Sequence, residues 1–331
     1  MIFIRLKKSS ILLMSAIVFS CCFILGINMW NHADKTYAQI DGKKIINYVK
    51  FTPNLEALQD CMEQDISTYN TEHHVNWIDI LSYLSIKYGN KYEKYDKKDV
   101  TGISEKLKQG QPIEDIVKNA KLLSYYKEAY TAVLGEFLGI RTVKHKDSEE
   151  PKEEYGLKVY SPLAKTFPFN HCDDFGASRS FGYSRPHLGH DMMSAVGTPV
   201  IAVESGYVEA MGWNKYGGWR IGIRSTDKKR YYYYAHLRQN KPFHINLKLN
   251  ENVEAGEVIG YVGRTGYSTH ENVNNISQSH LHWGLELIFD ESQKECNNEI
   301  WIDLYSITRL LEKNKSSVRR DPDTKEFFKK S

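Results

Sequence analysis

Cysteine is scarce in this chain, and neither sign of charge dominates. Of its five cysteines, Cys61, Cys172 and Cys296 are scattered without zinc-motif spacing, which excludes a disulfide scaffold and a cysteine zinc site. The 44 basic and 41 acidic residues leave a net charge of +3. This balance lacks the concentrated basic surface that nucleic-acid binding needs, so we expect no nucleic-acid partner.

The remaining composition is typical of a globular protein with at least one sizeable core. Hydrophobic residues make up 41% of the chain and charged residues 26%, which excludes a wholly disordered chain and a multi-span membrane protein. At about 150 residues per domain, the length allows roughly two domains.

The N-terminus has the pattern of a membrane anchor. Basic residues at Arg5, Lys7 and Lys8 precede Ile11–Trp30, a stretch of twenty residues without a charge. About 20 apolar residues span a bilayer core, and the basic flank stays cytoplasmic. We therefore predict a transmembrane helix within residues 1–30 of a single-pass cell-membrane protein whose C-terminal domain is extracytoplasmic. A cleaved signal peptide and a lipid-modified Cys21 are the alternatives.

Residues 53–142 are predicted to form a small all-α accessory domain with a partner that the sequence does not name. Asn76 is a suitable N-cap for a helix that stops at Gly89, as apolar residues recur at helical spacing between them. A second long helix is expected from Pro112 to about Leu138. The pair His73-His74 fits surface positions better than a metal site, because adjacent residues do not face each other on a helix.

After the helical region, the sequence changes to short β-rich segments separated by glycines, which predicts a mainly antiparallel β domain. Val253–Val262 is expected to form two strands joined by a tight turn, and Trp301–Leu311 a closing helix. The other β-rich segments are Val200–Val203, Arg220–Arg224 and Tyr231–Tyr234. The predicted division is a cytoplasmic flank and anchor at 1–30, a stalk at 31–52, the helical domain at 53–142, a solvated charged linker at 143–158, the β domain at 159–314 and a mobile charged tail at 315–331.

Histidines gather in three segments of the β domain. On a straight strand His187 and Asp191 would lie about 13 Å apart, so the chain between them has to bend, which Gly189 permits. A catalytic zinc site holds three protein ligands and a water molecule. The three segments are RPHLGHDMM with His187 and Asp191, YYYYAHL with His236, and SHLHWGLEL with His280 and His282.

These segments, in this order, resemble the lysostaphin-type zinc metallopeptidases, which cut peptides in bacterial peptidoglycan. The resemblance lies in H-x-x-x-D at His187, Y-x-H-L at Tyr234 and H-x-H at His280, framed by the glycine-rich segments Gly197–Val200 and Gly256–Gly266. It covers roughly Tyr160 to Leu311, about half of the chain.

The resemblance implies that His187, Asp191 and His282 bind one Zn²⁺ per chain, and that His236 and His280 are catalytic. It further implies hydrolysis of peptide cross-links or stem peptides by a zinc-activated water. Histidine titrates near neutrality, so His280 is a suitable general base. His236 would stabilise the oxyanion or protonate the leaving amine, and the sequence does not decide between these roles.

Two alternatives remain at this point. One is a catalytically inactive domain of the same fold that binds wall peptide or regulates a partner wall enzyme, and the other is a small-ligand module suggested only by Val253–Gly266. One departure from the family pattern, the insertion at His270–Gln278, is expected to enlarge a loop near the groove. His190 is expected to point away from Asp191, and His171 and its neighbour Cys172 are expected to face opposite sides of a strand. Simple surface or loop positions are expected for His244 and His270.

Overall fold

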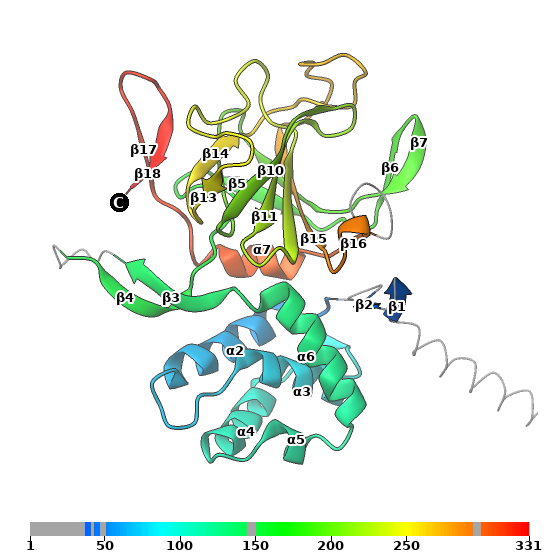
Figure 1. Ribbon diagram of the computed structural model, residues 1–331, viewed down its shortest axis with the longest axis vertical. Helices are drawn as coiled ribbons and strands as arrows, with labels where there is room; N and C mark the ends of the chain where they lie inside the picture. The colour runs from blue at the N-terminus through cyan, green and yellow to red at the C-terminus, as the bar shows by residue number, and fades with distance from the viewer. Residues whose placement is uncertain (1–36, 41–42, 47–50, 144–149, 294–298, 331) are drawn as a thin grey trace, which may run out of the picture. The chain divides into compact units, whose positions relative to one another are not determined.

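The computed structural model describes residues 37–40, 43–46, 51–143, 150–293 and 299–330. The chain divides into two compact units, Met1–Val49 and Lys50–Ser331. In the first unit, β1 (Tyr37–Ile40) and β2 (Lys43–Ile46) form an antiparallel hairpin within the predicted stalk. The other helices and strands described below belong to the second unit (Figure 1).

The predicted transmembrane helix has to be removed from the fold. None of the helices in the described ranges is both long and apolar enough to cross a membrane. The longest of these, α6 (Ala120–Leu134), has 15 residues, or about 22 Å at 1.5 Å per residue, whereas a bilayer core is about 30 Å thick. Residues 1–30, on which the prediction rested, lie outside the described residues.

The region after Pro53 is helical, as predicted. Asn76 caps α3 (Trp77–Tyr88) by accepting a hydrogen bond from the backbone N–H of Ile78 at 2.8 Å. Gly89 ends this helix in the left-handed conformation, with φ at 57°, which glycine adopts without strain. The helices are α2 (Leu55–Thr68), α3 (Trp77–Tyr88), the short η1 (Tyr92–Lys94), α4 (Lys97–Lys108), α5 (Ile113–Ile116) and α6 (Ala120–Leu134).

The prediction of one helix from Pro112 to Leu138 is wrong. The chain leaves the helical conformation at Val117, whose ψ is 107°. Asn119 then caps a new helix by accepting from the backbone N–H of Leu122 at 3.0 Å. An asparagine side chain competes for backbone donors and favours a cap over a helix interior, so the apolar stripe continues across a break.

An eight-stranded antiparallel sheet forms the core of the C-terminal part, in agreement with the predicted β domain. Its strand order is β13-β10-β11-β12-β15-β8-β5, with β16 also paired to β15. The strands are β5 (Phe169–Cys172), β8 (His190–Ser194), β10 (Gly206–Asn214), β11 (Gly218–Ser225), β12 (Arg230–Ala235), β13 (Asn252–Val253), β15 (His280–Leu287) and β16 (Ile300–Trp301).

Smaller elements surround this sheet. The predicted turn between Val253 and Val262 is present, but its two strands pair elsewhere, β13 with β10 and β14 (Val258–Tyr261) with β9 (Pro199–Ile201). The predicted closing helix begins late, because α7 is Tyr305–Leu311. A hairpin of β6 (Ser178–Phe181) and β7 (Tyr183–Pro186) connects β5 to β8 (Figure 1).

The two faces of the sheet differ because side chains alternate along each strand. On β12, Tyr232 and Tyr234 are fully buried in the core, whereas Tyr231 and Tyr233 line a cavity on the other face. On β15, Leu281, Trp283 and Leu285 are buried in the core. The intervening His280 and His282 therefore face the cavity.

Two segments predicted to be irregular contain strands. Within the predicted charged linker, β4 (Lys152–Leu157) pairs with β3 (Leu138–Val143), and residues 144–149 lie outside the described residues. Within the predicted mobile tail, β17 (Val318–Arg320) pairs with β18 (Phe327–Lys329). Phe327 packs on the core beside Ile201 and Tyr261, so an apolar anchor holds this charged segment in place.

A buried ion pair joins the sheet to the helices. Arg230, 1% exposed, donates to both carboxylate oxygens of Glu204 at 2.8 and 3.1 Å. Its third nitrogen donates to the backbone carbonyl of Ala132, near the end of α6, at 3.1 Å. Tyr232 donates its hydroxyl to the same Glu204 at 2.6 Å. Replacing Arg230 therefore leaves Glu204 without its cation and the carbonyl of Ala132 without its donor.

We predict that Arg230→Leu destabilises the protein by about 3–5 kcal/mol, because it leaves the Glu204 carboxylate buried without its cation. Urea unfolding followed by circular dichroism measures this loss. The control is Lys248→Ala, which breaks the exposed pair between Lys248 and Glu251 and should change stability by about 0.5 kcal/mol or less. Equal effects of the two substitutions would contradict a structural role for the buried pair.

Candidate metal centre

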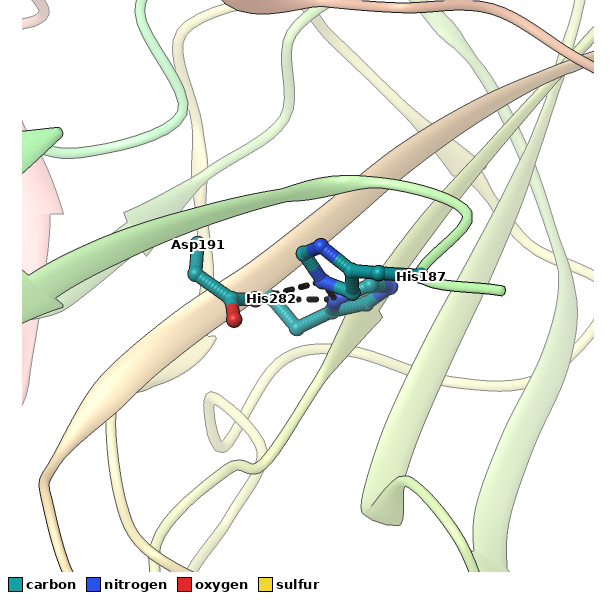
Figure 2. Close-up of side chains that lie close together, drawn as sticks. All are labelled: His187, Asp191 and His282. Carbon is teal, nitrogen blue, oxygen red and sulfur yellow. Dashed lines mark hydrogen bonds and ion pairs between the residues drawn. The ribbon is translucent and has the colours of Figure 1, made fainter. Parts of the chain in front are cut away.

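Three neighbouring strands bring the predicted site residues together. In the register of β8 and β15, Asp191 lies directly opposite His282, and in that of β12 and β15, Ala235 lies opposite His282. His236 follows Ala235 at the end of β12, and His187 lies in the turn between β7 and β8. Figure 2 shows His187, Asp191 and His282 pointing toward one another.

Three atoms of these side chains form a nearly equilateral triangle. The Nε2 atom of His187 lies 3.0 Å from Oδ1 of Asp191 and 2.9 Å from Nδ1 of His282, and the latter two atoms are 3.0 Å apart. Donors that bind a tetrahedral zinc ion at about 2.0–2.2 Å lie roughly 3.3–3.6 Å from one another. A small outward movement of the three atoms would therefore admit such an ion.

The hydrogen bond on the far side of the His187 ring determines which nitrogen faces the triangle as a lone pair. Its Nδ1 lies 3.2 Å from the backbone carbonyl of Asp174, an acceptor, so Nδ1 carries the proton in the neutral ring. The Nε2 lone pair then faces Oδ1 of Asp191, which is also an acceptor. Two acceptors at 3.0 Å repel each other unless a cation lies between them, so the donor set fits a metal ion.

The electrostatics of the triangle keep its ligands in metal-binding form. Burial alone would raise the pKa of Asp191, but the side chains of His187 and His282, together with the nearby His280, hold it well below its ordinary value. Burial lowers the pKa of His282, and Asp191 offsets only part of this effect. An ionised carboxylate and a neutral imidazole are the forms in which these groups bind metals.

His236 and His280 face the same cavity beside the triangle. Their ring centroids are 4.8 Å apart, and Nε2 of His280 lies 3.8 Å from Oδ1 of Asp191. Each ring places Nδ1 at 2.9 Å from a backbone carbonyl, that of Thr265 for His236 and that of Gln278 for His280. In the neutral rings both Nε2 atoms are therefore proton acceptors. Burial, followed by the nearby His280 and His282, lowers the pKa of His236 well below its usual value.

The backbone at His236 adopts the left-handed conformation, with φ at 60°, which costs a non-glycine residue on the order of 1–3 kcal/mol. Its N–H donates to the carbonyl of Gly217 at 2.7 Å, and its carbonyl accepts from Gly263 at 2.9 Å. These two bonds hold the residue in this conformation and direct its ring into the cavity.

Two residues near the triangle were missed from the sequence. Asp174 places Oδ1 at 3.0 Å from Nδ1 of His187, and Arg179 on β6 donates to Asp174 and, at 3.3 Å, to Oδ2 of Asp191. Such outer partners orient metal ligands and tune their basicity. No spacing rule identifies them, since they come from the loop and hairpin between β5 and β8.

The site opens into a cavity of about 950 Å³. The lining includes four tyrosines, a tryptophan and several charged side chains from the sheet and the surrounding loops. Outside the metal triangle and its two neighbouring histidines, these include Arg179, Arg185, Tyr216, Arg220, Tyr231, Tyr233, Tyr267, Glu286 and Trp301.

The insertion at 270–278 does not line this cavity. Tyr267, which precedes the insertion, does line the cavity. Asn272 instead accepts from the indole N–H of Trp219 at 2.9 Å and donates to the side chain of Asn240 at 2.7 Å. These hydrogen bonds hold the inserted loop against the neighbouring turn at Asn240.

The other histidines have structural partners. His190 points away from Asp191, as expected, and contacts His171 at 2.9 Å, and His171 in turn contacts Glu312 at 2.7 Å. Burial, followed by His171, lowers the pKa of His190 to about 4. His244 is not a simple surface residue, because it is only 5% exposed. In the helical part, His74 pairs with the buried Asp65 at 2.8 Å.

Comparison with known proteins identifies this part of the chain. The model of peptidase family M23 matches residues 185–295. This segment is a peptidase family M23 domain. The family resemblance predicted from the histidine motifs is thereby confirmed.

Relatives of the M23 domain differ in how much of their length this chain covers. The L-Ala–D-Glu endopeptidase of Bacillus subtilis (strain 168) is 34% identical over 166 residues, 50% of this chain and 47% of that protein. Lysostaphin of Staphylococcus simulans is 40% identical over 84 residues, 25% of this chain and 16% of that protein. The chain thus spans about half of the first relative and about a sixth of the second.

A solved structure similar to the M23 domain is the catalytic domain of lysostaphin from Staphylococcus simulans. It is 29% identical with a TM-score of 0.33, and the match covers 43% of this chain and 92% of that one.

We predict that Gly189→Ala abolishes tight binding of a divalent metal by the M23 domain. A Cβ atom there would lie 2.5 Å from Cε1 and 2.6 Å from Nε2 of His282, so the ring has to leave the triangle. Metal content after dialysis measures the effect. The control is Gly102→Ala on α4, where a Cβ meets no atom within 4 Å. Retention of metal in the Gly189 variant would show that His282 is not required.

Proposed function

We propose that this chain is a zinc-dependent endopeptidase that hydrolyses peptide bonds in bacterial peptidoglycan, outside the cytoplasm where that substrate lies. One observation carries the proposal. The three converging atoms of His187, Asp191 and His282 lie within 4.8 Å of one another, in a cavity that His236 and His280 also line.

Zinc is the metal that this donor set suits best. Two imidazole nitrogens and one carboxylate oxygen make a three-ligand set typical of catalytic zinc, with the fourth position left for water. When bound, the metal supplies a Lewis acid and lowers the pKa of its water from 15.7 toward about 7.

The two remaining histidines supply proton transfer. We assign His280 as the general base, because its Nε2 acceptor lies beside the triangle, 3.8 Å from Oδ1 of Asp191. His236 is the second transfer group, which serves the oxyanion or the leaving amine. Its carbonyl-anchored Nδ1 keeps the Nε2 atom directed to the reacting bond.

The substrate class rests on relatives of the M23 domain. The names of two of them, an L-Ala–D-Glu endopeptidase and lysostaphin, together with the family resemblance, favour a wall peptide. The alternative of an inactive wall-binding domain is less well supported. Mere binding does not require two histidines whose Nε2 acceptors face a metal site.

The function is tested by digesting purified peptidoglycan with the zinc-loaded protein and identifying new amino and carboxyl ends by mass spectrometry. We expect one zinc per chain and release of peptide fragments. Asp191→Ala should lose both, because it removes the one charged ligand of a three-ligand site. Tight stoichiometric zinc in that variant would contradict the ligand assignment, and an inactive zinc-loaded parent would contradict the hydrolase.

His236→Ala and His280→Ala should separate chemistry from coordination. We expect either variant to keep zinc and lose about 10²–10⁴-fold in peptide cleavage, the usual cost of a general acid–base group. Zinc content and cleavage are measured on the same preparation. Loss of metal in His280→Ala would make His280 a ligand, whereas near-normal cleavage would exclude a catalytic role for the residue replaced.

A further inference from the structure

The cavity contains a guanidinium that the proposed chemistry does not use. Arg185 lies on β7, two residues before the predicted ligand His187, and both side chains line the cavity. The Nη1 atom of Arg185 is buried without a hydrogen-bond partner. Leaving such a donor unpaired is costly, so an acceptor is expected to occupy this position in the working protein.

Aromatic side chains hold this guanidinium in place. It lies 4.7 Å from the ring centroid of Tyr216 and 5.3 Å from that of Tyr267. Its Nη2 atom donates to the hydroxyl of Tyr267 at 3.3 Å. Phe181, on the partner strand of the hairpin, stacks on the same Tyr267 with ring centroids 5.5 Å apart. The side chain is therefore positioned before any ligand arrives, which lowers the entropic cost of binding.

No anion of the described chain neutralises Arg185. No carboxylate in the described ranges lies within salt-bridge distance of it, although Arg179, another guanidinium of the cavity, pairs with Asp174 and Asp191. An arginine offers a planar fork of donors that matches a carboxylate, and the pairing is strongest where water is excluded.

We propose that Arg185 binds a carboxylate of the substrate, so that the enzyme prefers a wall peptide with a free carboxylate next to the cleaved bond. This rests on the proposed function and adds a substrate class to it. Arg185 recognises the substrate rather than performing chemistry, because its guanidinium stays charged at any pH of interest.

The test uses two synthetic wall stem peptides that are identical except for one group. One carries D-glutamate with its free α-carboxylate, and the other carries the carboxamide. We expect the zinc-loaded full chain to cleave the carboxylate peptide with a kcat/KM about 10–100-fold higher, the usual value of a hydrogen bond to a charged group. Arg185→Gln should remove this preference and leave cleavage of the carboxamide peptide within about threefold.

Two further variants separate recognition from a structural clamp. Lys215→Gln is the matched control, because Lys215 also contacts the ring of Tyr216, at 4.9 Å, but does not line the cavity, and it should keep the full preference. Arg185→Lys keeps the positive charge without the planar fork of donors, and it should keep part of the preference for the carboxylate peptide. An equal loss of kcat/KM for both peptides in Arg185→Gln would mean that Arg185 has only a structural role, and would contradict recognition of the carboxylate. A preference that survives in Arg185→Gln but disappears in Arg220→Gln would move the carboxylate to Arg220 and overturn the proposal.

Calorimetric binding of the same two peptides separates this proposal from the proposed function. Tighter binding of the carboxylate peptide that depends on Arg185, without cleavage, would support the subsite and contradict the hydrolase. Cleavage of both peptides at equal rates would support the hydrolase and overturn the subsite. If the protein neither binds nor cleaves the two peptides, both the subsite and the hydrolase are overturned.

Discussion

The antiparallel register between β8 and β15 is the constraint on which the site depends. It places Asp191 opposite His282, and a slip of one residue would turn one of the two side chains to the other face of the sheet. The register is held by residues that take no part in the site, since Leu281, Trp283 and Leu285 alternate with the histidines and are buried on the opposite face. The core therefore specifies the metal centre through the two-residue period of a strand.

Main-chain carbonyls perform a second task, which is to select the tautomer of each ring. His187, His236 and His280 each place Nδ1 against a backbone carbonyl, that of Asp174, Thr265 and Gln278 respectively. A carbonyl accepts but never donates, so each ring must present Nε2 as a lone pair. His282 lacks this arrangement and turns Nδ1 to the triangle. Because these anchors belong to the backbone, they place no demand on the side chains at the three positions.

Local patterns in the sequence predicted much of this fold and the members of the site. Caps and apolar spacing predicted α3, and β-rich segments such as Tyr231–Tyr234 predicted strands of the sheet. Long-range pairing was not predictable in this way. The strand at Lys152–Leu157 is dense in charge and exists because it pairs with Leu138–Val143. Asp174, Arg179 and Arg185 were missed for a similar reason, as a connection between strands positions them and no fixed spacing relates them to their partners. The membrane anchor was predicted from an apolar run and a basic flank within residues 1–30, which lie outside the described residues, and no helix of the described ranges can cross a membrane.

The bond between Arg230 and the carbonyl of Ala132 has a consequence for where the protein can be divided. A boundary drawn from composition at residue 159 separates the helices from the sheet, yet it cuts through the coordination of a buried charge. A fragment that began there would retain Arg230 and Glu204 but expose one side of their pair to water, with one guanidinium nitrogen deprived of its acceptor. The stability of the sheet thus depends on residues beyond its own strands. Its smallest stable fragment includes the last turn of α6, a helix that contributes no residue to the cavity.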